Sequence, residues 1–390
     1  MRFFVIALLV GCSLAASLEG ETRVRRNAYA TAVDCPVTLW PGGKICYTWD
    51  SSISDSADGP KMMKLVKDVF DHYMDVSCVE FYPSTASECD GIDAMDVKLV
   101  EEEHNECWAD IECSNSQNKF INVSPECATF GVVTHELFHS LGRYHEQSRN
   151  DRDEHIKVNW DAIITEKQGN YKKCSNKPYT DTYDYQSIMH YGDMFFASGS
   201  AETMTIIESN KERYQKLMGT QTQLSPNDVV TLNSMYKCYS AGMDVKCAHG
   251  GVKKANGDCF CVEPFTGSNC EDVDPALGVI VEIEGESYVD SPNFPSNYPA
   301  NQKTFIVLQC PAGKRVSIKF LTFEVEQYGT GCGYDWLDIR LGPGDIYGNK
   351  FCGKDLQDTT LESEDNYIVL KFVTDGLWEY EGFEGEVTCI

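Results

Sequence analysis

Apolar residues in the first half of the chain recur at helical spacing. The segment 60–74 carries them on what would be one buried helix face, at Met63, Val66, Phe70 and Met74. The segment 129–141 predicts a second helix, and short runs at 97–100 and 120–123 predict strands. Residues 27–239 are therefore expected to form a mixed α+β domain.

The pattern changes toward the end of the chain. Alternating or apolar runs separated by turn residues occupy 315–320, 336–341 and 367–373, which predicts an all-β domain over 274–390. Before it, residues 243–271 are rich in Gly and Cys and poor in apolar residues. Such a segment cannot build a core and has to be held together by disulfides.

Composition narrows the classes of function. With 390 residues, 42% of them hydrophobic, the chain is expected to form two or three globular domains. A net charge of −27 argues against binding to nucleic acid and against electrostatic docking on anionic lipid. No apolar run after the N-terminus reaches the length of about 20 residues that spans a bilayer. Eighteen cysteines indicate an oxidising compartment.

The first residues predict secretion. Residues 1–16 combine a short basic start, an apolar stretch and small residues at a cleavage site, as a secretory signal does. Removing this segment takes Cys12 with it and leaves seventeen cysteines, an odd number. At least one cysteine is then free or paired between chains.

A dense basic cluster at 23–26 interrupts an otherwise acidic chain. It is either a solvated charge run or a processing site after Arg26. Processing would define 17–26 as a short propeptide and release a new amino terminus at Asn27.

The strongest chemical signal is the pattern H-E-x-x-H, which begins at His135. On a helix, positions i and i+4 share a face, so His135 and His139 can reach one ion with Glu136 beside it. Gly142 can end the helix and reverse the chain, which brings His145 round as a third ligand. Three histidines with an open position are typical of catalytic zinc. Such a metal activates water for hydrolysis of a peptide bond, with Glu136 as proton acceptor.

Four segments resemble the astacin family of metzincin metalloproteases. They are HELFHSLGRYHEQSRNDRD at 135–153, SIMHY at 187–191, WPGG at 40–43 and LSPND at 224–228. The resemblance covers residues 27 to 238. It implies zinc as the cofactor, one ion per chain, with His135, His139 and His145 as ligands and Glu136 as general base.

The same resemblance assigns further roles. Met189 would form the turn beneath the metal, and Tyr191 would be an extra ligand that swings away to stabilise the oxyanion. Glu146 would meet the buried ammonium of Asn27 after processing. In the latent form, an acid of the prosegment occupies the zinc, and the matching residue is Glu21, although the surrounding motif differs from that of the family.

The resemblance also implies disulfides Cys78–Cys238 and Cys107–Cys127. Five cysteines of the domain then remain, namely Cys35, Cys46, Cys89, Cys113 and Cys174. Of these, the neighbours Cys35 and Cys46 are expected to pair. Asn122 belongs to the only glycosylation sequon of the chain and is predicted either to carry a glycan or to be an unmodified strand residue.

The remaining segments resemble two accessory modules. Residues 243–271 resemble an EGF-like module that has lost one bridge, which implies Cys247–Cys259 and Cys261–Cys270. Residues 274–390 resemble a CUB domain, a β-sandwich used for protein binding, on SPNFPSNYP at 291–299 and on Gly382-Phe383. That resemblance implies Cys332–Cys352, and Cys310 could bond to Cys389.

Three acids of the CUB-like segment match positions that hold calcium in many such domains, namely Glu326, Asp335 and Asp375. Carboxylate oxygens are ligands that calcium prefers, and an acidic surface is the competing account.

The sequence therefore predicts a secreted zinc endopeptidase, made as a zymogen, that acts on extracellular proteins. Its accessory modules would bind matrix or cell-surface proteins. The alternative is a catalytically vestigial protein that acts only through those modules.

Overall fold

The computed structural model divides the chain into two compact units. The first comprises residues 1–243 and 254–257, and the second comprises 244–253 and 258–390. The structure describes residues 33–35, 37–100, 106–111, 119–207, 211–239, 246–327 and 332–390. The predictions for the signal segment 1–16, the propeptide 17–26, Glu21, Asn27 and Cys113 lie outside the described residues.

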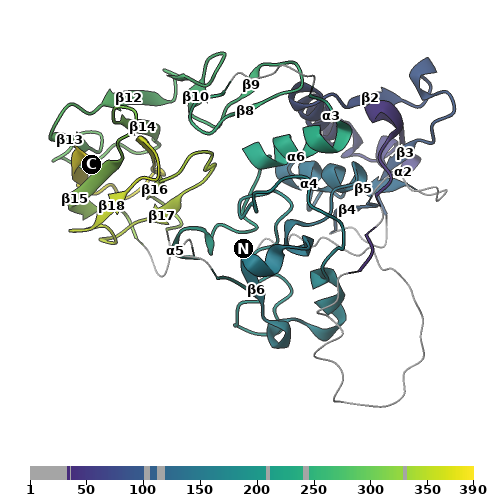
Figure 1. Cartoon of the computed structure of the whole chain (residues 1–390), viewed down its shortest axis with the longest axis horizontal. Helices are drawn as coiled ribbons and strands as arrows, with labels where there is room; N and C mark the ends of the chain where they lie inside the picture. Colours follow the sequence, from purple (N-terminus) through teal and green to yellow (C-terminus); the bar gives the residue numbers. More distant parts are fainter. Residues whose placement is uncertain are drawn as a thin grey trace. The chain divides into compact units, whose positions relative to one another are not determined.

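A five-stranded sheet forms one layer of the first unit, in the order β2-β1-β3-β5-β4 (Figure 1). The pairs β1–β2, β1–β3 and β3–β5 are parallel, and β4 runs antiparallel to β5. The strands are β1 Lys44–Trp49, β2 Glu80–Pro83, β3 Met95–Lys98, β4 Trp108–Ala109 and β5 Phe120–Asn122. A separate two-stranded sheet pairs β6 Ile156–Val158 with β7 Met204–Ile206.

Helices α3 and α4 pack on each other and on this sheet. The helices are α2 Ser51–Ser54, α3 Gly59–Val76, α4 Phe130–Ser140, α5 Lys211–Tyr214 and α6 Pro226–Tyr236. Short 3-10 turns are η1 Pro41–Gly43, η2 Ser87–Cys89, η4 Glu146–Ser148, η5 Arg152–Glu154, η6 Trp160–Ala162 and η7 Thr165–Tyr171. None of the described helices is long and apolar enough to cross a bilayer.

The predicted helix over 60–74 is present as α3, but the prediction of its buried residues is partly wrong. Val66 and Phe70 are buried as expected, whereas Met63 is half-buried and Met74 is 37% exposed. The buried stripe is completed by Met62, Val69, Tyr73 and Val76. Tyr73 points inward because its hydroxyl donates a hydrogen bond to the Thr134 carbonyl at 2.8 Å, which satisfies its polar end.

All sixteen cysteines among the described residues form disulfides. The pairs are Cys35–Cys174, Cys46–Cys89, Cys78–Cys238, Cys107–Cys127, Cys247–Cys259, Cys261–Cys270, Cys310–Cys389 and Cys332–Cys352. The pairs that the family resemblances implied are all among them.

The expected pair Cys35–Cys46 is wrong. Cys46 lies on β1 opposite Tyr82 of β2, and the turn that follows β2 carries Cys89 to it. Cys35 instead lies beside Cys174, because Val33 forms a parallel β-bridge with that residue.

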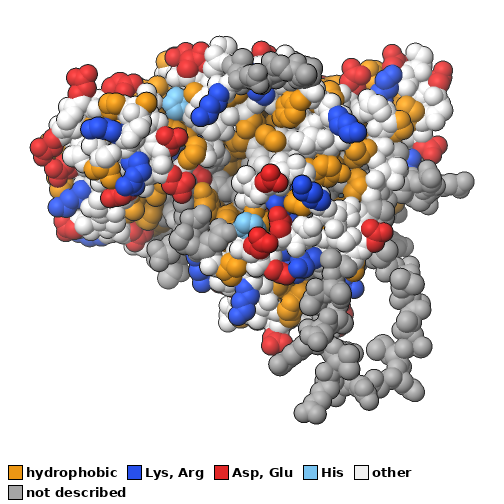
Figure 2. Space-filling model, viewed as in Figure 1, with side chains coloured by type: hydrophobic (Ala, Val, Ile, Leu, Met, Phe, Trp, Pro, Cys, Tyr) orange, Lys and Arg blue, Asp and Glu red, His pale blue; other side chains and the backbone are white. Residues whose placement is uncertain are grey.

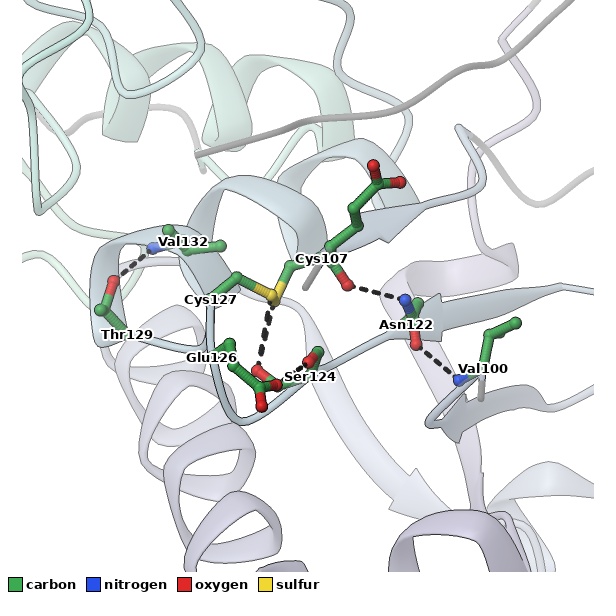
Figure 3. The surroundings of a disulfide bond; sticks show 9 residues. Val100, Cys107, Asn122, Ser124, Glu126, Cys127, Thr129 and Val132 are labelled. Atoms are coloured by element: carbon green, nitrogen blue, oxygen red, sulfur yellow. Dashed lines mark hydrogen bonds between the residues drawn. A yellow bond between two sulfur atoms is a disulfide. The ribbon is translucent and has the colours of Figure 1, made fainter. Parts of the chain in front are cut away.

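The surroundings of Asn122 favour the alternative of an unmodified strand residue (Figure 3). Its side chain lies in the last position of β5 and is completely buried. The amide nitrogen donates to the Glu106 carbonyl at 2.7 Å, and the amide oxygen accepts from the Val100 N–H at 2.9 Å. A glycan on this buried nitrogen would need space at the edge of the sheet, so glycosylation of Asn122 stays a prediction that the burial of the side chain disfavours.

The second unit contains two facing sheets (Figure 1). One has five strands in the order β12-β14-β19-β16-β17, and the other has four in the order β13-β20-β15-β18. Their strands are β12 Gly278–Glu282, β13 Ser287–Asp290, β14 Lys303–Gln309, β15 Val316–Glu324, β16 Trp336–Arg340, β17 Asn349–Phe351, β18 Thr360–Glu362, β19 Tyr367–Val373 and β20 Gly382–Cys389. Phe320, Phe323, Phe372 and Phe383 are buried between the sheets.

The cysteine-rich segment packs on the outer face of the five-stranded sheet. It forms two hairpins, from β8 Val252–Lys253, β9 Cys259–Phe260, β10 Phe265–Thr266 and β11 Asp272–Val273. Strand β14 is buried on both faces, because Ile306 and Leu308 point into the sandwich while Phe305 and Val307 pack against Phe265. This double burial explains why β14 is apolar without alternation.

Acidic and basic side chains are interspersed on the face of the molecule that Figure 2 shows, although the chain carries a net charge of −27. On that face the acidic side chains are distributed over both units rather than gathered in one patch.

Candidate metal centre

Helix α4 presents the first two candidate ligands. Its N-terminus is capped by Thr129, whose side chain accepts from the Val132 N–H at 3.3 Å. The helix then carries His135 and His139 on one face, with their ring centres 4.9 Å apart. The helical spacing alone therefore brings these two imidazoles together.

The third candidate ligand, His145, is brought to the other two histidines by a turn at Gly142. The helix ends at Ser140, and Gly142 has a φ of +96°, a left-handed conformation that side chains rarely adopt. The Arg143 N–H then donates to the Phe138 carbonyl at 3.0 Å, which closes the turn. The reversed chain places His145 opposite the other two imidazoles.

The three imidazoles converge on one point. The Nε2 atom of His145 lies 3.3 Å from Nε2 of His135 and 3.1 Å from Nε2 of His139. The Nδ1 atoms of His135 and His139 each lie 2.6 Å from a carbonyl oxygen, of Ile188 and Arg143 respectively. Because a carbonyl only accepts, each Nδ1 carries the proton and each Nε2 offers a lone pair. The donor set therefore fits a zinc ion held by three neutral imidazoles.

Burial keeps these histidines in the neutral form that binds metal. It lowers the pKa of His135 to about 4 and the pKa values of His139 and His145 well below their ordinary range.

Burial acts in the opposite sense on Glu136 and raises the pKa of its carboxyl well above the usual value. One carboxyl oxygen of Glu136, Oε1, is buried and makes no hydrogen bond within the described part of the protein. Leaving such an atom unpaired is costly, so its partner is expected to be a reactant or water at the centre.

The predicted turn residues lie beside the imidazoles. Met189 is completely buried, and its carbonyl accepts from the Glu146 N–H at 2.9 Å. The ring of Tyr191 lies 4.3 Å from the ring of His145, and its backbone N–H donates to Gln147 Oε1 at 3.2 Å. Burial raises the pKa of Tyr191, so its phenol stays protonated and can donate a hydrogen bond.

Asp228, the last residue of the LSPND segment, anchors this turn, a role that the sequence did not reveal. Its carboxylate accepts from the Ser187 hydroxyl at 2.6 Å and from the Ile188 N–H at 2.8 Å. It also accepts from the N–H of Ser225, with which it forms a capping box at the start of α6. The pattern Ser-x-x-Asp could have revealed the cap, but not the distant turn that the carboxylate also binds.

Glu146 is buried and already has several partners within the described residues. It forms ion pairs with Arg143 and Arg149, and it accepts from the Asp184 N–H at 3.0 Å. The two arginines were not foreseen, because only an ammonium at Asn27 was expected to face this carboxylate.

A second group of candidate ligands lies in the second unit. Glu326, Asp335 and Asp375 each offer a carboxylate oxygen, and these oxygens lie within 4.8 Å of one another. Glu326 and Asp335 are only 8% and 1% exposed, and Oε2 of Glu326 is buried without a hydrogen bond to any described residue. Burial and repulsion by the neighbouring acids raise the pKa of Glu326, and burial raises that of Asp335. The cluster thus offers buried, mutually repelling oxygens that a divalent cation would satisfy.

The comparison with protein families decides the identity of the first unit. Residues 32–237, more than half of the chain, match the sequence model of Astacin, which describes a peptidase family. The chain belongs to the astacin family. The three histidines that converge in this astacin fit a metal centre of that peptidase family. Residues 281–386 match the CUB domain. The predicted α+β protease domain followed by an all-β CUB domain is confirmed at this level.

Relatives with similar sequences extend across both domains. This astacin is 30% identical to Protein SpAN of Strongylocentrotus purpuratus, over 96% of this chain and 60% of SpAN. It is 29% identical to Blastula protease 10 of Paracentrotus lividus, over 94% of this chain and 61% of that protein. It is 31% identical to Zinc metalloproteinase dpy-31 of Brugia malayi, over 72% of this chain and 48% of that protein. The chain thus spans about three fifths or less of the length of these relatives.

The structure predicts that Asp228 supports the centre through the turn that it anchors. Replacing it in Asp228→Ala leaves the buried Ser187 hydroxyl and Ile188 N–H unpaired, at about 1–3 kcal/mol each. We expect the free energy of unfolding of the first unit to fall by at least about 2 kcal/mol in urea denaturation. The neighbouring Asn227→Ala, which removes one exposed hydrogen bond of 3.3 Å, should change it by less than about 0.5 kcal/mol. Equal losses in the two variants would contradict the anchoring role.

Proposed function

We propose that this astacin is a secreted, zinc-dependent endopeptidase that cleaves peptide bonds in extracellular proteins. The observation that carries the proposal is the convergence of three imidazole Nε2 atoms. The adjacent Glu136 contributes a buried carboxyl oxygen that accepts no hydrogen bond from any described residue. Eight disulfides among the described residues and the match to the CUB domain are consistent with work outside the cell.

Each residue of the centre has a role that its surroundings support. His135, His139 and His145 would hold the zinc, which when bound polarises the scissile carbonyl and activates a water molecule. Glu136 would take the proton of that water and deliver it to the leaving amine, and burial favours proton uptake because it raises the pKa of this carboxyl. Tyr191, whose phenol stays protonated, would donate a hydrogen bond to the developing oxyanion or bind the metal in the resting enzyme. Met189 would form the turn that lies beneath the metal.

Exchange of Glu136 tests this mechanism. In the processed protein, Glu136→Gln should bind zinc with unchanged stoichiometry but lose at least about a hundredfold in peptide cleavage, because the ligands remain and the base does not. The exposed Glu126→Gln is the matched control and should retain full activity. Activity on a peptide library should disappear with a chelator and return with zinc. Undiminished cleavage by Glu136→Gln would refute the mechanism, and an inactive wild type with bound zinc would favour the vestigial binding protein.

We also propose that the protein is made as a zymogen that is cleaved after Arg26. Asn27 lies eight residues before Cys35, so an extended segment would reach at most about 27 Å from that cysteine. Cys35 itself lines a small cavity beside His145, which brings the start of the domain within reach of Glu146. The ammonium of Asn27 would join the two arginines that already contact Glu146. Before cleavage, Glu21 would occupy the metal.

Replacing Arg25 and Arg26 by alanine tests the processing site. The uncleaved protein should have low activity, and a recognition site for an added protease placed before Asn27 should restore activity after digestion. Glu146→Ala is not a clean test, because it strands two buried arginines in either form. Full activity of the uncleaved alanine variant would rule out the zymogen.

The C-terminal unit is proposed to bind proteins and calcium. We infer that residues 243–271 are an EGF-like module and that 274–390, the CUB domain, bind matrix or cell-surface partners. Glu326, Asp335 and Asp375 would hold one calcium ion. Tyr298 supports this site, because its hydroxyl donates to Asp335 at 2.7 Å and accepts from the Glu326 N–H at 3.0 Å.

Thermal unfolding with and without calcium tests the site. Calcium in excess should raise the melting temperature of the second unit in the wild type, because it binds the folded form. Glu326→Gln should be at least as stable without calcium, since it removes a repelling charge, but should lose the response. Glu324→Gln, two residues away and outside the cluster, should respond like the wild type. Equal responses of the two variants would refute the site.

A further inference from the structure

The disulfide Cys35–Cys174 ties the start of the described chain to a distant loop. It closes a sequence separation of 139 residues. Backbone hydrogen bonds accompany it, from the Val33 N–H to the Lys173 carbonyl and from the Ser175 N–H to the Val33 carbonyl, both at 2.8 Å. The segment that contains Val33 and Cys35 is thus fixed on the loop by covalent and hydrogen bonds.

That loop is in turn bonded to the segment that follows the third candidate ligand. The Cys174 N–H donates to the Ser148 carbonyl at 2.7 Å, and the Ser148 N–H donates to the His145 carbonyl at 3.0 Å. Two hydrogen bonds and one disulfide therefore connect Cys35 to the backbone of His145.

The chain after Cys35 also touches the turn that brings His145 into place. A Cβ atom added to Gly142 would lie 2.9 Å from Val37 Cγ1 and 3.1 Å from Leu39 Cδ2. Val37 and Leu39 are therefore in close contact with the reversing glycine, and they hold the turn from its outer side.

A cavity separates the disulfide from the imidazole. It has a volume of about 40 Å³, and its lining includes Cys35, Cys174, Gly142, Arg143 and His145. Space of this size admits only a few water molecules. If the segment of Cys35 moved away, this partly open space would widen beside His145, and the turn at Gly142 would lose its contacts with Val37 and Leu39.

We propose that the Cys35–Cys174 disulfide is a positioning element for the third metal ligand. As a clamp, it holds Cys35, Val37 and Leu39 against the turn 142–148 and so keeps His145 in the orientation that binds zinc. Without the bond, a chain end held only by a few hydrogen bonds frays. The inference rests on the proposed zinc site, because positioning has meaning only if His145 binds the metal.

The test compares two double variants of the full chain. Cys35→Ser/Cys174→Ser removes the clamp, and Cys46→Ser/Cys89→Ser removes another disulfide, which joins β1 to η2. Zinc affinity is measured by competition with a chelator, and the ligand geometry is followed in the visible spectrum of the cobalt-substituted protein. Loss of the clamp should weaken zinc binding about 10–100-fold, as loss of groups that orient ligands does, and should alter the cobalt spectrum. The control should keep its affinity within about threefold and its spectrum unchanged.

A second variant tests the same contact if the clamp variant does not fold. Should the clamp variant not fold, Val37→Ala keeps the disulfide but weakens the contact with Gly142, and it should weaken zinc binding in the same direction. The proposal would be overturned if the clamp variant, Val37→Ala and the wild type bound zinc with equal affinity. It would also be overturned if both disulfide variants lost the same amount of zinc affinity. A wild type that binds no zinc would instead refute the proposed zinc site itself.

Discussion

The candidate zinc centre depends on two buried carboxylates, each of which accepts a hydrogen bond from a distant stretch of chain. A buried charge is tolerated only when it is paired and hydrogen-bonded, so each carboxylate fixes the groups around it. Glu146 joins the segment after His145 to two arginines and to the Asp184 N–H. Asp228 holds Ile188, whose carbonyl accepts from Nδ1 of His135. Through these contacts, both the third imidazole and the first are oriented by charges that lie outside the zinc motif.

In the second unit, buried carboxylates likewise need hydrogen-bond partners, and Tyr298 provides one. This tyrosine is almost completely buried, and its ring packs against Phe372 with the ring centres 5.1 Å apart. Its hydroxyl then bridges Asp335 and the backbone of Glu326. One side chain therefore links the apolar core of the sandwich to the acidic cluster, so the carboxylates are held together although they repel one another. The proposed calcium ion would offset this repulsion, because carboxylate oxygens are ligands that calcium prefers.

Local sequence patterns predicted the features that depend on residues close together in the chain. They failed for contacts and disulfides that depend on segments far apart in the sequence. Helix α4 and its histidines follow from spacing, because i and i+4 face one side on any helix. The partner of the buried Tyr73 hydroxyl is the Thr134 carbonyl, 61 positions away, and the sequence gives no sign of this contact. Cys35 pairs with Cys174 and not with its sequence neighbour for the same reason. The burial of Asn122 also requires two partner segments, whereas the sequon is read from three residues.

The two candidate metal sites differ in the way burial tunes their donors. At the first centre, burial lowers the pKa values of three histidines, so neutral nitrogen donors converge without mutual charge repulsion. At the second, burial and neighbouring charges raise the pKa of Glu326, so the oxygen donors resist ionisation until a cation compensates them. Nitrogen donors in a compact triad suit zinc, whereas clustered carboxylates suit calcium. The same desolvation thus favours the uncharged form of the donors in both units, because it acts on a cationic acid in one unit and on a neutral acid in the other.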